Sequence, residues 1–164
     1  MKKRLFGALL AFAMALSIGC VSALAVEPSV KYLDYDYMET FSEGMALVYK
    51  DCQWGFIDKT GKLVVGLQYD SANSFHNGYA SVAKYENEEM KVGFIDKTGK
   101  VVVPVIYDTV FDFSEGLAAV VKEGKLGFVD TAGNVVVPFE YDYGAYEEYY
   151  FSGGLAVVTT GDYL

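Results

Sequence analysis

The sequence predicts an all-β protein built from tandem repeats. Three stretches of the chain align with one another, their glycines recur at fixed positions, and no window beyond residue 25 has the period of an amphipathic helix. Each stretch contains runs rich in β-branched residues that are bounded by turn residues. We therefore expect β-hairpins or three-stranded units stacked in an open, solenoid-like array, with a curled, propeller-like arrangement as the alternative.

Residues 1–25 have the plan of a secretory signal peptide, with a basic start, an apolar run over 5–18 and small residues ending at Ala25. We expect cleavage after Ala25 and export to the bacterial cell envelope or beyond it. Lipidation of Cys20 is the alternative, although Ser17 stands where lipoprotein signals usually carry leucine. The apolar run is shorter than the roughly 20 residues that span a bilayer. We therefore expect no transmembrane segment in the mature chain.

A phenylalanine opens each repeat, at positions 41, 75, 113 and 151, and the underlying period is 34 residues. Two spacings of 38 arise from four extra residues around Tyr85–Met90 and four more before Phe151. The array is either capped by an incomplete last unit or part of something longer. The expected divisions are a half-repeat over 26–40, repeats over 41–74, 75–112 and 113–150, and a partial repeat over 151–164.

A hairpin is predicted in each repeat, preceded by one further strand such as 117–121. An aspartate is expected to cap the hairpin turn, and a glycine three residues later should have positive φ, as in a type I turn with a G1 bulge. Two prolines should end the second strand, at a strand end or a sheet edge. These residues are Asp58, Asp96 and Asp130, then Gly61, Gly99 and Gly133, then Pro104 and Pro138.

The repeated phrase resembles the bacterial WG-repeat family, also called KWG repeats. It reads Phe-Ser-Glu-Gly, then Trp-Gly-Phe-Ile-Asp-Lys-Thr-Gly-Lys, a valine-rich run and Tyr-Asp, between about residues 32 and 164. Only the first copy has the tryptophan, at Trp54, whereas Val92 and Leu126 replace it in the others, which indicates a packing position rather than a ligand-binding residue. The resemblance implies an all-β array in bacterial proteins that are often exported or attached to other domains.

Composition argues against several functions. The formal net charge of -9 repels phosphate backbones, so we expect no nucleic-acid partner. The sequence has a single histidine, His76, and no candidate partner for it, which leaves few possible acid-base catalytic sites. The repeated aspartates suit turn caps, and the acidic stretches 34–36 and 86–89 lack the spacing of a calcium loop. We therefore expect no enzyme, metal or cofactor. An envelope-acting hydrolase using carboxylates such as Glu43 and Glu115 is the remote alternative.

Cys52, the one cysteine after residue 25, aligns with Gly124 and is expected to be a small turn residue. The aromatic residues of the last insertion are more informative, because the periodic core does not require them. They form the candidate recognition surface: Tyr143, Tyr146, Tyr149 and Tyr150. Core or edge cover is the other interpretation of these rings. The sequence thus predicts a non-catalytic module that binds a protein or a cell-envelope polysaccharide, with self-assembly through edge-to-edge pairing of the last unit as the alternative.

Overall fold

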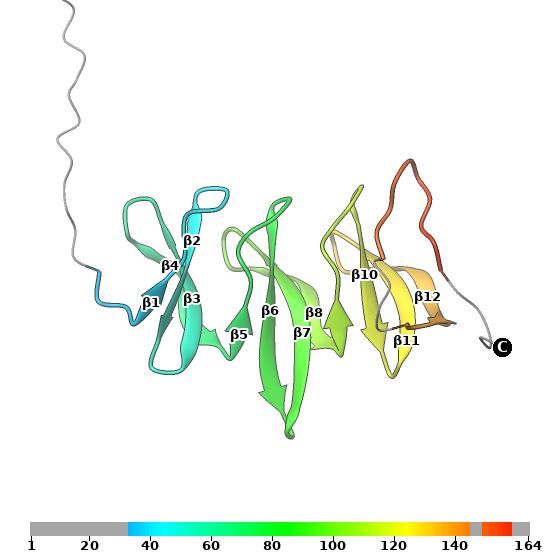
Figure 1. Cartoon of the computed structure of the whole chain (residues 1–164), viewed down its shortest axis with the longest axis horizontal. Helices are drawn as coiled ribbons and strands as arrows, with labels where there is room; N and C mark the ends of the chain where they lie inside the picture. The colour runs from blue at the N-terminus through cyan, green and yellow to red at the C-terminus, as the bar shows by residue number, and fades with distance from the viewer. Residues whose placement is uncertain (1–32, 145–148, 159–164) are drawn as a thin grey trace, which may run out of the picture. The chain divides into compact units, whose positions relative to one another are not determined.

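The structure, a computed structural model, describes residues 33–144 and 149–158, all of which belong to the unit Lys31–Leu164. These residues form three four-stranded antiparallel sheets, and none of them lies in a helix (Figure 1). The described part of the chain accordingly offers no helix that could cross a membrane. The predicted signal peptide, with Ala25 and Cys20, lies outside the described residues.

Each sheet is a meander whose strand order follows the chain. The first sheet contains β1 (Tyr37–Met38), β2 (Met45–Lys50), β3 (Gln53–Asp58) and β4 (Leu63–Tyr69). The second contains β5 (Ser71–Ala72), β6 (Tyr79–Glu86), β7 (Glu89–Asp96) and β8 (Val101–Tyr107). The third contains β9 (Thr109–Val110), β10 (Leu117–Lys122), β11 (Lys125–Asp130) and β12 (Val135–Asp142).

The two-residue first strand of every sheet was not expected from the sequence. It follows the repeated Tyr-Asp pair and pairs with the second strand, as Ser71 does with Ala83 in the second sheet. The aspartate amide starts this pairing, because Asp70 N donates to Ala83 O at 3.0 Å and Asp108 N donates to Val121 O at 2.8 Å. The stretch between two repeated phenylalanines therefore contributes strands to two sheets.

Two-residue turns connect β2 to β3, β6 to β7 and β10 to β11. Both turn residues have positive φ, including Cys52 at 62° and Gly124 at 74°, which is the geometry of a type I′ turn. Cys52 lies in the turn between β2 and β3, as predicted, and is exposed.

The predicted Asp-capped turns are also confirmed. Gly61 has a φ of 77°, and its N–H donates to Asp58 O at 2.8 Å. Asp58 Oδ1 accepts from the N–H groups of Thr60 and Lys62 at 2.8 and 3.1 Å. The turns at Asp96 and Asp130 repeat this pattern, so each aspartate satisfies the amides of its own turn.

The expectation that prolines end the second hairpin strand is wrong. Pro104 lies inside β8 and Pro138 inside β12, and both strands continue beyond them. Both strands are sheet edges, as expected, and their pairing with the neighbouring strand is interrupted by register shifts. An edge strand with an irregular ladder tolerates a residue that has no N–H, and so the strand does not stop.

A glycine on the neighbouring strand makes this irregular pairing possible. A Cβ atom on Gly93 would lie 2.5 Å from Val103 O and 2.6 Å from Pro104 O, which is closer than any side chain tolerates. Gly55 and Gly127 face their partner strands in the same way. The glycine of the repeated Gly-Phe-Ile-Asp phrase is thus required by the close approach of two backbones.

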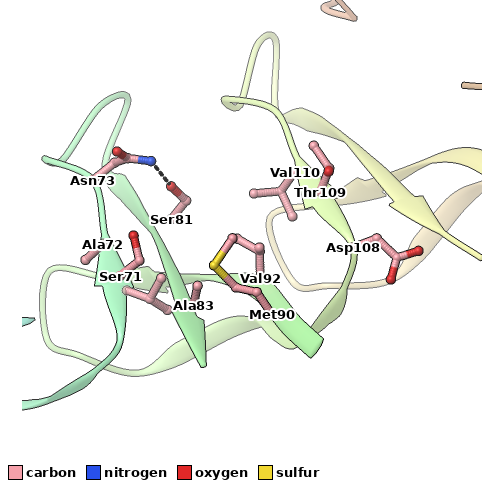
Figure 2. Close-up of a pocket in the computed structure, with 11 residues that line it drawn as sticks. Ser71, Ala72, Asn73, Ser81, Ala83, Met90, Val92, Asp108, Thr109 and Val110 are labelled. Carbon is pink, nitrogen blue, oxygen red and sulfur yellow. Dashed lines mark hydrogen bonds between the residues drawn. The ribbon is translucent and has the colours of Figure 1, made fainter. Parts of the chain in front are cut away.

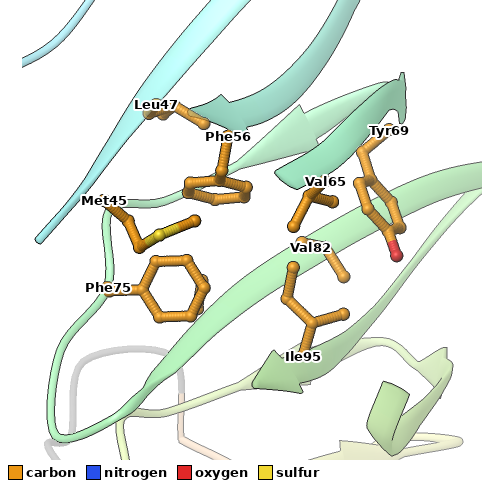
Figure 3. Close-up of a cluster of buried hydrophobic side chains, with 9 residues drawn as sticks. Met45, Leu47, Phe56, Val65, Tyr69, Phe75, Val82 and Ile95 are labelled. Carbon is orange, nitrogen blue, oxygen red and sulfur yellow. The ribbon is translucent and has the colours of Figure 1, made fainter. Parts of the chain in front are cut away.

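Apolar clusters join each sheet to the next one in the chain. The first contains Leu47 and Phe56 from the first sheet and Val82 and Ile95 from the second (Figure 3). The second cluster joins the second and third sheets, and the third joins the third sheet to residues 149–158. Among the described residues no cluster joins the first sheet to the third. The units therefore stack as an open array, which confirms the predicted fold class.

The repeated phenylalanine carries each of these junctions. Its ring packs against the phenylalanine of the Gly-Phe-Ile-Asp phrase in the preceding unit, at closely similar distances three times. The pairs are Phe56–Phe75 at 4.8 Å between ring centroids, Phe94–Phe113 at 4.9 Å and Phe128–Phe151 at 5.0 Å.

We predict that Gly93→Ala destabilises the protein by about 1–3 kcal/mol, because the added methyl group meets backbone carbonyls that cannot move independently. Gly66→Ala is the matched control, since no atom lies within 4 Å of its added Cβ. The control should change the free energy of unfolding by less than about 0.5 kcal/mol. Urea denaturation measures both, and equal effects would contradict the close approach.

Candidate functional site

The repeated serine links each unit to the next. Ser42 Oγ donates to Phe75 O at 2.6 Å, and Ser114 Oγ donates to Phe151 O at 2.7 Å. The middle repeat has His76 in place of the serine, and there Asn77 Nδ2 donates to Phe113 O at 2.9 Å. The carbonyl of the repeated phenylalanine is therefore held by a side chain at every junction.

The carboxylates considered for sugar hydrolysis take part in the same links. Glu43 Oε2 accepts from Gly78 N at 3.0 Å and from Lys97 Nζ at 2.9 Å. The hydrogen bond from Lys97 lowers the pKa of Glu43. Glu115 accepts from the backbone N–H groups of Gly153 and Gly154, both at 2.8 Å. Each glutamate thus binds the turn of the next unit, at a different junction.

The three turn aspartates have lowered pKa values, the opposite of what a general acid needs. The Thr60 hydroxyl is the main cause for Asp58, Thr98 for Asp96, and the Asn134 side chain for Asp130, with backbone N–H donors adding to each. Hydrogen bonds that stabilise the charged form of a carboxyl lower its pKa in this way. This supports their assignment as turn caps.

His76 does have a partner, contrary to the expectation from the sequence. Its Nδ1 lies 3.1 Å from Asp112 Oδ2, and both side chains are exposed. The two residues are 36 positions apart and come together only because consecutive units stack. The acidic stretches are also engaged, with Asp34 2.6 Å from Lys50 and Glu89 2.8 Å from Lys91. In residues 33–144 and 149–158, no group of three potential ligands is placed to hold a metal ion.

The candidate tyrosine surface is not a single surface. Tyr149 is only 2% exposed, so its predicted place on a recognition surface is wrong. The Tyr149 ring centroid lies 5.3 Å from that of Phe111, and the Tyr149 hydroxyl accepts from Gly144 N at 2.9 Å. Tyr143 is partly buried beside it. Tyr146 lies outside the described residues, and Tyr150 is 55% exposed.

A hollow that the sequence did not reveal lies between the second and third sheets. Side chains of β5, β6 and β7 face β9 across this hollow (Figure 2), which is a cavity of about 230 Å³ by volume. Its wall is apolar near Ala83, Val92 and Val110, and its edge is polar, where Asn73 Nδ2 donates to Ser81 Oγ at 2.8 Å. The cavity is lined by Ser71, Ala72, Asn73, Ser81, Val82, Ala83, Met90, Val92, Asp108, Thr109 and Val110.

The four extra residues of the second repeat lengthen the β6–β7 hairpin beside this cavity. They add the pairs Tyr85 with Met90 and Glu86 with Glu89 to the two strands. Met90 lines both the cavity and an adjoining hollow formed with Glu89, Lys91, Asp108 and Glu123.

Ion-paired side chains line the adjoining hollow. Lys91 Nζ is 2.7 Å from Asp108 Oδ1 and 2.8 Å from Glu89 Oε2. The hydrogen bonds to Asp108 and Glu89 raise the pKa of Lys91, and Lys91 in turn lowers that of Asp108. Lys91 and Asp108 therefore both stay charged at neutral pH. With Glu123 added, the rim carries more negative than positive charge.

A family model described as WG containing repeat matches residues 30–51, 54–87, 93–125 and 127–163. These segments cover well over half of the chain, and they confirm the resemblance drawn from the repeated phrase. No curated protein and no solved structure matches the chain.

We predict that Tyr149→Ala lowers the free energy of unfolding by about 3–5 kcal/mol, because a buried ring leaves a cavity against Phe111. The neighbouring Tyr150→Ala is the control and should change the free energy by less than about 0.5 kcal/mol, since the ring is exposed. Urea titrations followed by circular dichroism compare the two. A similar loss in both variants would show that burial does not distinguish these tyrosines.

Proposed function

We propose that this chain, which belongs to the WG-repeat family, is an exported, non-catalytic module that binds another macromolecule, either a protein or a cell-envelope polysaccharide. The plan of residues 1–25, typical of a signal peptide, supports export. Stacked units support binding, because they form an extended surface that makes few demands on any single residue.

The structural roles of the repeated polar residues support this proposal further. The repeated serine, glutamate and aspartate residues are engaged in turns and junctions. A site for recognition is therefore expected where the repeat is broken. The observation that carries the proposal is that two such breaks meet at one place, the lengthened β6–β7 hairpin and the cavity beside it.

Self-assembly is the second candidate, and it is favoured by two side chains near the end of the described residues. Leu155 and Val157 are 77% and 80% exposed. Their counterparts in the first repeat, Met45 and Leu47, are buried in the cluster shared with the next sheet. A second copy of the chain would cover this apolar pair as the next sheet covers the earlier one.

A pull-down with the purified protein, against separate protein and polysaccharide fractions of the producing cell's envelope, tests both candidates. We expect saturable capture of one partner that is lost in the double variant Tyr85→Ser, Met90→Ser, because both side chains are exposed on the lengthened hairpin. Val136→Ser, at a similarly exposed apolar side chain on β12, is the control and should retain capture.

If the double variant captures the partner as well as the unchanged protein does, the lengthened hairpin is excluded as the binding surface. Light scattering on the same sample measures the oligomeric state. If no partner is captured and the protein forms concentration-dependent oligomers, self-assembly replaces binding as the proposed function.

A further inference from the structure

Three equivalent spaces occur in the array. The first lies between the first and second sheets, the middle one between the second and third sheets, and the third between the third sheet and residues 149–158. Equivalent positions are counted from the repeated phenylalanine. At the first space Trp54 packs against Tyr49, with ring centroids 4.8 Å apart, and against Tyr37 at 5.9 Å. Trp54 also packs against the cluster that joins the first two sheets, as Ala72 of the next sheet does. An aromatic group of the chain itself thus fills the first space.

The third space is filled by another aromatic residue of the chain. Tyr149 lies in one cluster with Val121 and Leu126, the counterparts of Tyr49 and Trp54. Its ring is 5.3 Å from Phe111 and 6.0 Å from Tyr143. The tyrosine comes from the insertion, so an irregular segment supplies the ring that the third repeat lacks.

The middle space has small side chains at positions where one or other of the flanking repeats has a ring. Ser71, Ala83 and Val92 stand at the positions of Tyr37, Tyr49 and Trp54, and Asn73 stands at that of Phe111. None of the described residues that line the space is aromatic, and the cavity of about 230 Å³ remains. The second repeat thus lacks the three rings of the first repeat and the Phe111 ring of the third, and no insertion supplies another ring among the residues that line the space.

We infer that this middle space binds a tyrosine or tryptophan side chain of a partner protein. The inference rests on the proposed binding function and specifies its partner. The cavity is smaller than the roughly 300–1,000 Å³ of sites for drug-sized ligands, which suits a single side chain. Rings of the chain occupy the two equivalent spaces, so the shape between stacked units accepts a ring.

The walls of the cavity suit the chemistry of such a side chain. Ala72, Ala83, Val92 and Val110 offer apolar contact, and the Met90 thioether offers a favourable sulfur–aromatic contact. Asn73, Ser81 and Thr109 line the cavity with polar groups that can bond a tyrosine hydroxyl or an indole N–H. A purely aliphatic side chain would leave these groups without that partner.

Charge indicates what flanks the aromatic residue in the partner. The adjoining hollow brings Glu89, Asp108 and Glu123 together with only Lys91. Glu86 and Glu88 lie on the same lengthened hairpin and are exposed. A segment with lysine or arginine beside its aromatic residue would complement this rim and associate faster at low salt.

An NMR titration of the purified protein tests the inference with three short peptides, acetyl-Lys-Trp-Lys-amide, acetyl-Lys-Tyr-Lys-amide and acetyl-Lys-Ala-Lys-amide. We expect shifts at Ala83, Val92 and Val110 with an aromatic peptide, and at least tenfold weaker binding of the alanine peptide. Equal binding of all three peptides, or no shift at these residues, would overturn the inference.

Variants that fill the cavity provide a second test of the inference. Val92→Trp and Ala83→Tyr each introduce the residue of the first repeat, and each should weaken binding of the aromatic peptides at least tenfold while the protein stays folded. Tyr150→Ser is the control and should bind as the unchanged protein does. Unchanged binding in a folded Val92→Trp or Ala83→Tyr protein would overturn the inference, and if neither folds, the comparison of peptides decides.

The inference and the proposed function can fail separately. If the Val92→Trp protein still captures the envelope partner, the cavity is not the binding site although the module binds. If an aromatic peptide binds the cavity but neither envelope fraction contains a partner, the inference on the cavity holds and the proposed function fails.

Discussion

The array depends on one constraint: its sheets are apolar on both faces, so each must be covered twice. In the first sheet Leu47 faces the second sheet, whereas Val48 lies in the cluster covered by Leu33 and Tyr35. A strand buried on both sides cannot be stable in an isolated meander, because one apolar face would remain in water. Stacking is therefore the condition under which any unit folds, and the repeated phenylalanine is the side chain that joins one unit to the next.

Stacking also explains why the repeated polar residues are unavailable for chemistry. Glu115 binds the amides of Gly153 and Gly154, and Asn77 replaces the missing serine at its junction. Function in such a chain is left to positions where the repeat is broken. The repeat is broken at the middle junction, where small side chains and a lengthened hairpin coincide.

Local features were predictable from the sequence because they depend on neighbouring residues. The Asp58 cap and the Cys52 turn each involve a few consecutive positions, and three copies made their patterns clear. The short first strands could not be predicted because two residues carry no periodicity. The burial of Tyr149 could not be predicted because its insertion has no counterpart in the other repeats. The cavity was missed because it becomes visible only when strand register brings positions such as Ser71, Ala83 and Val92 to one place.

The central claim is that two of three equivalent spaces between units are filled by the chain's own rings while the middle one is open. Crystals of the protein soaked with 5-bromoindole test this most directly, because anomalous scattering locates the bromine. The account predicts one bromine site among β5, β6, β7 and β9, and none at Trp54 or Tyr149. A middle space that holds Met90 or Tyr85 instead of the indole would contradict it.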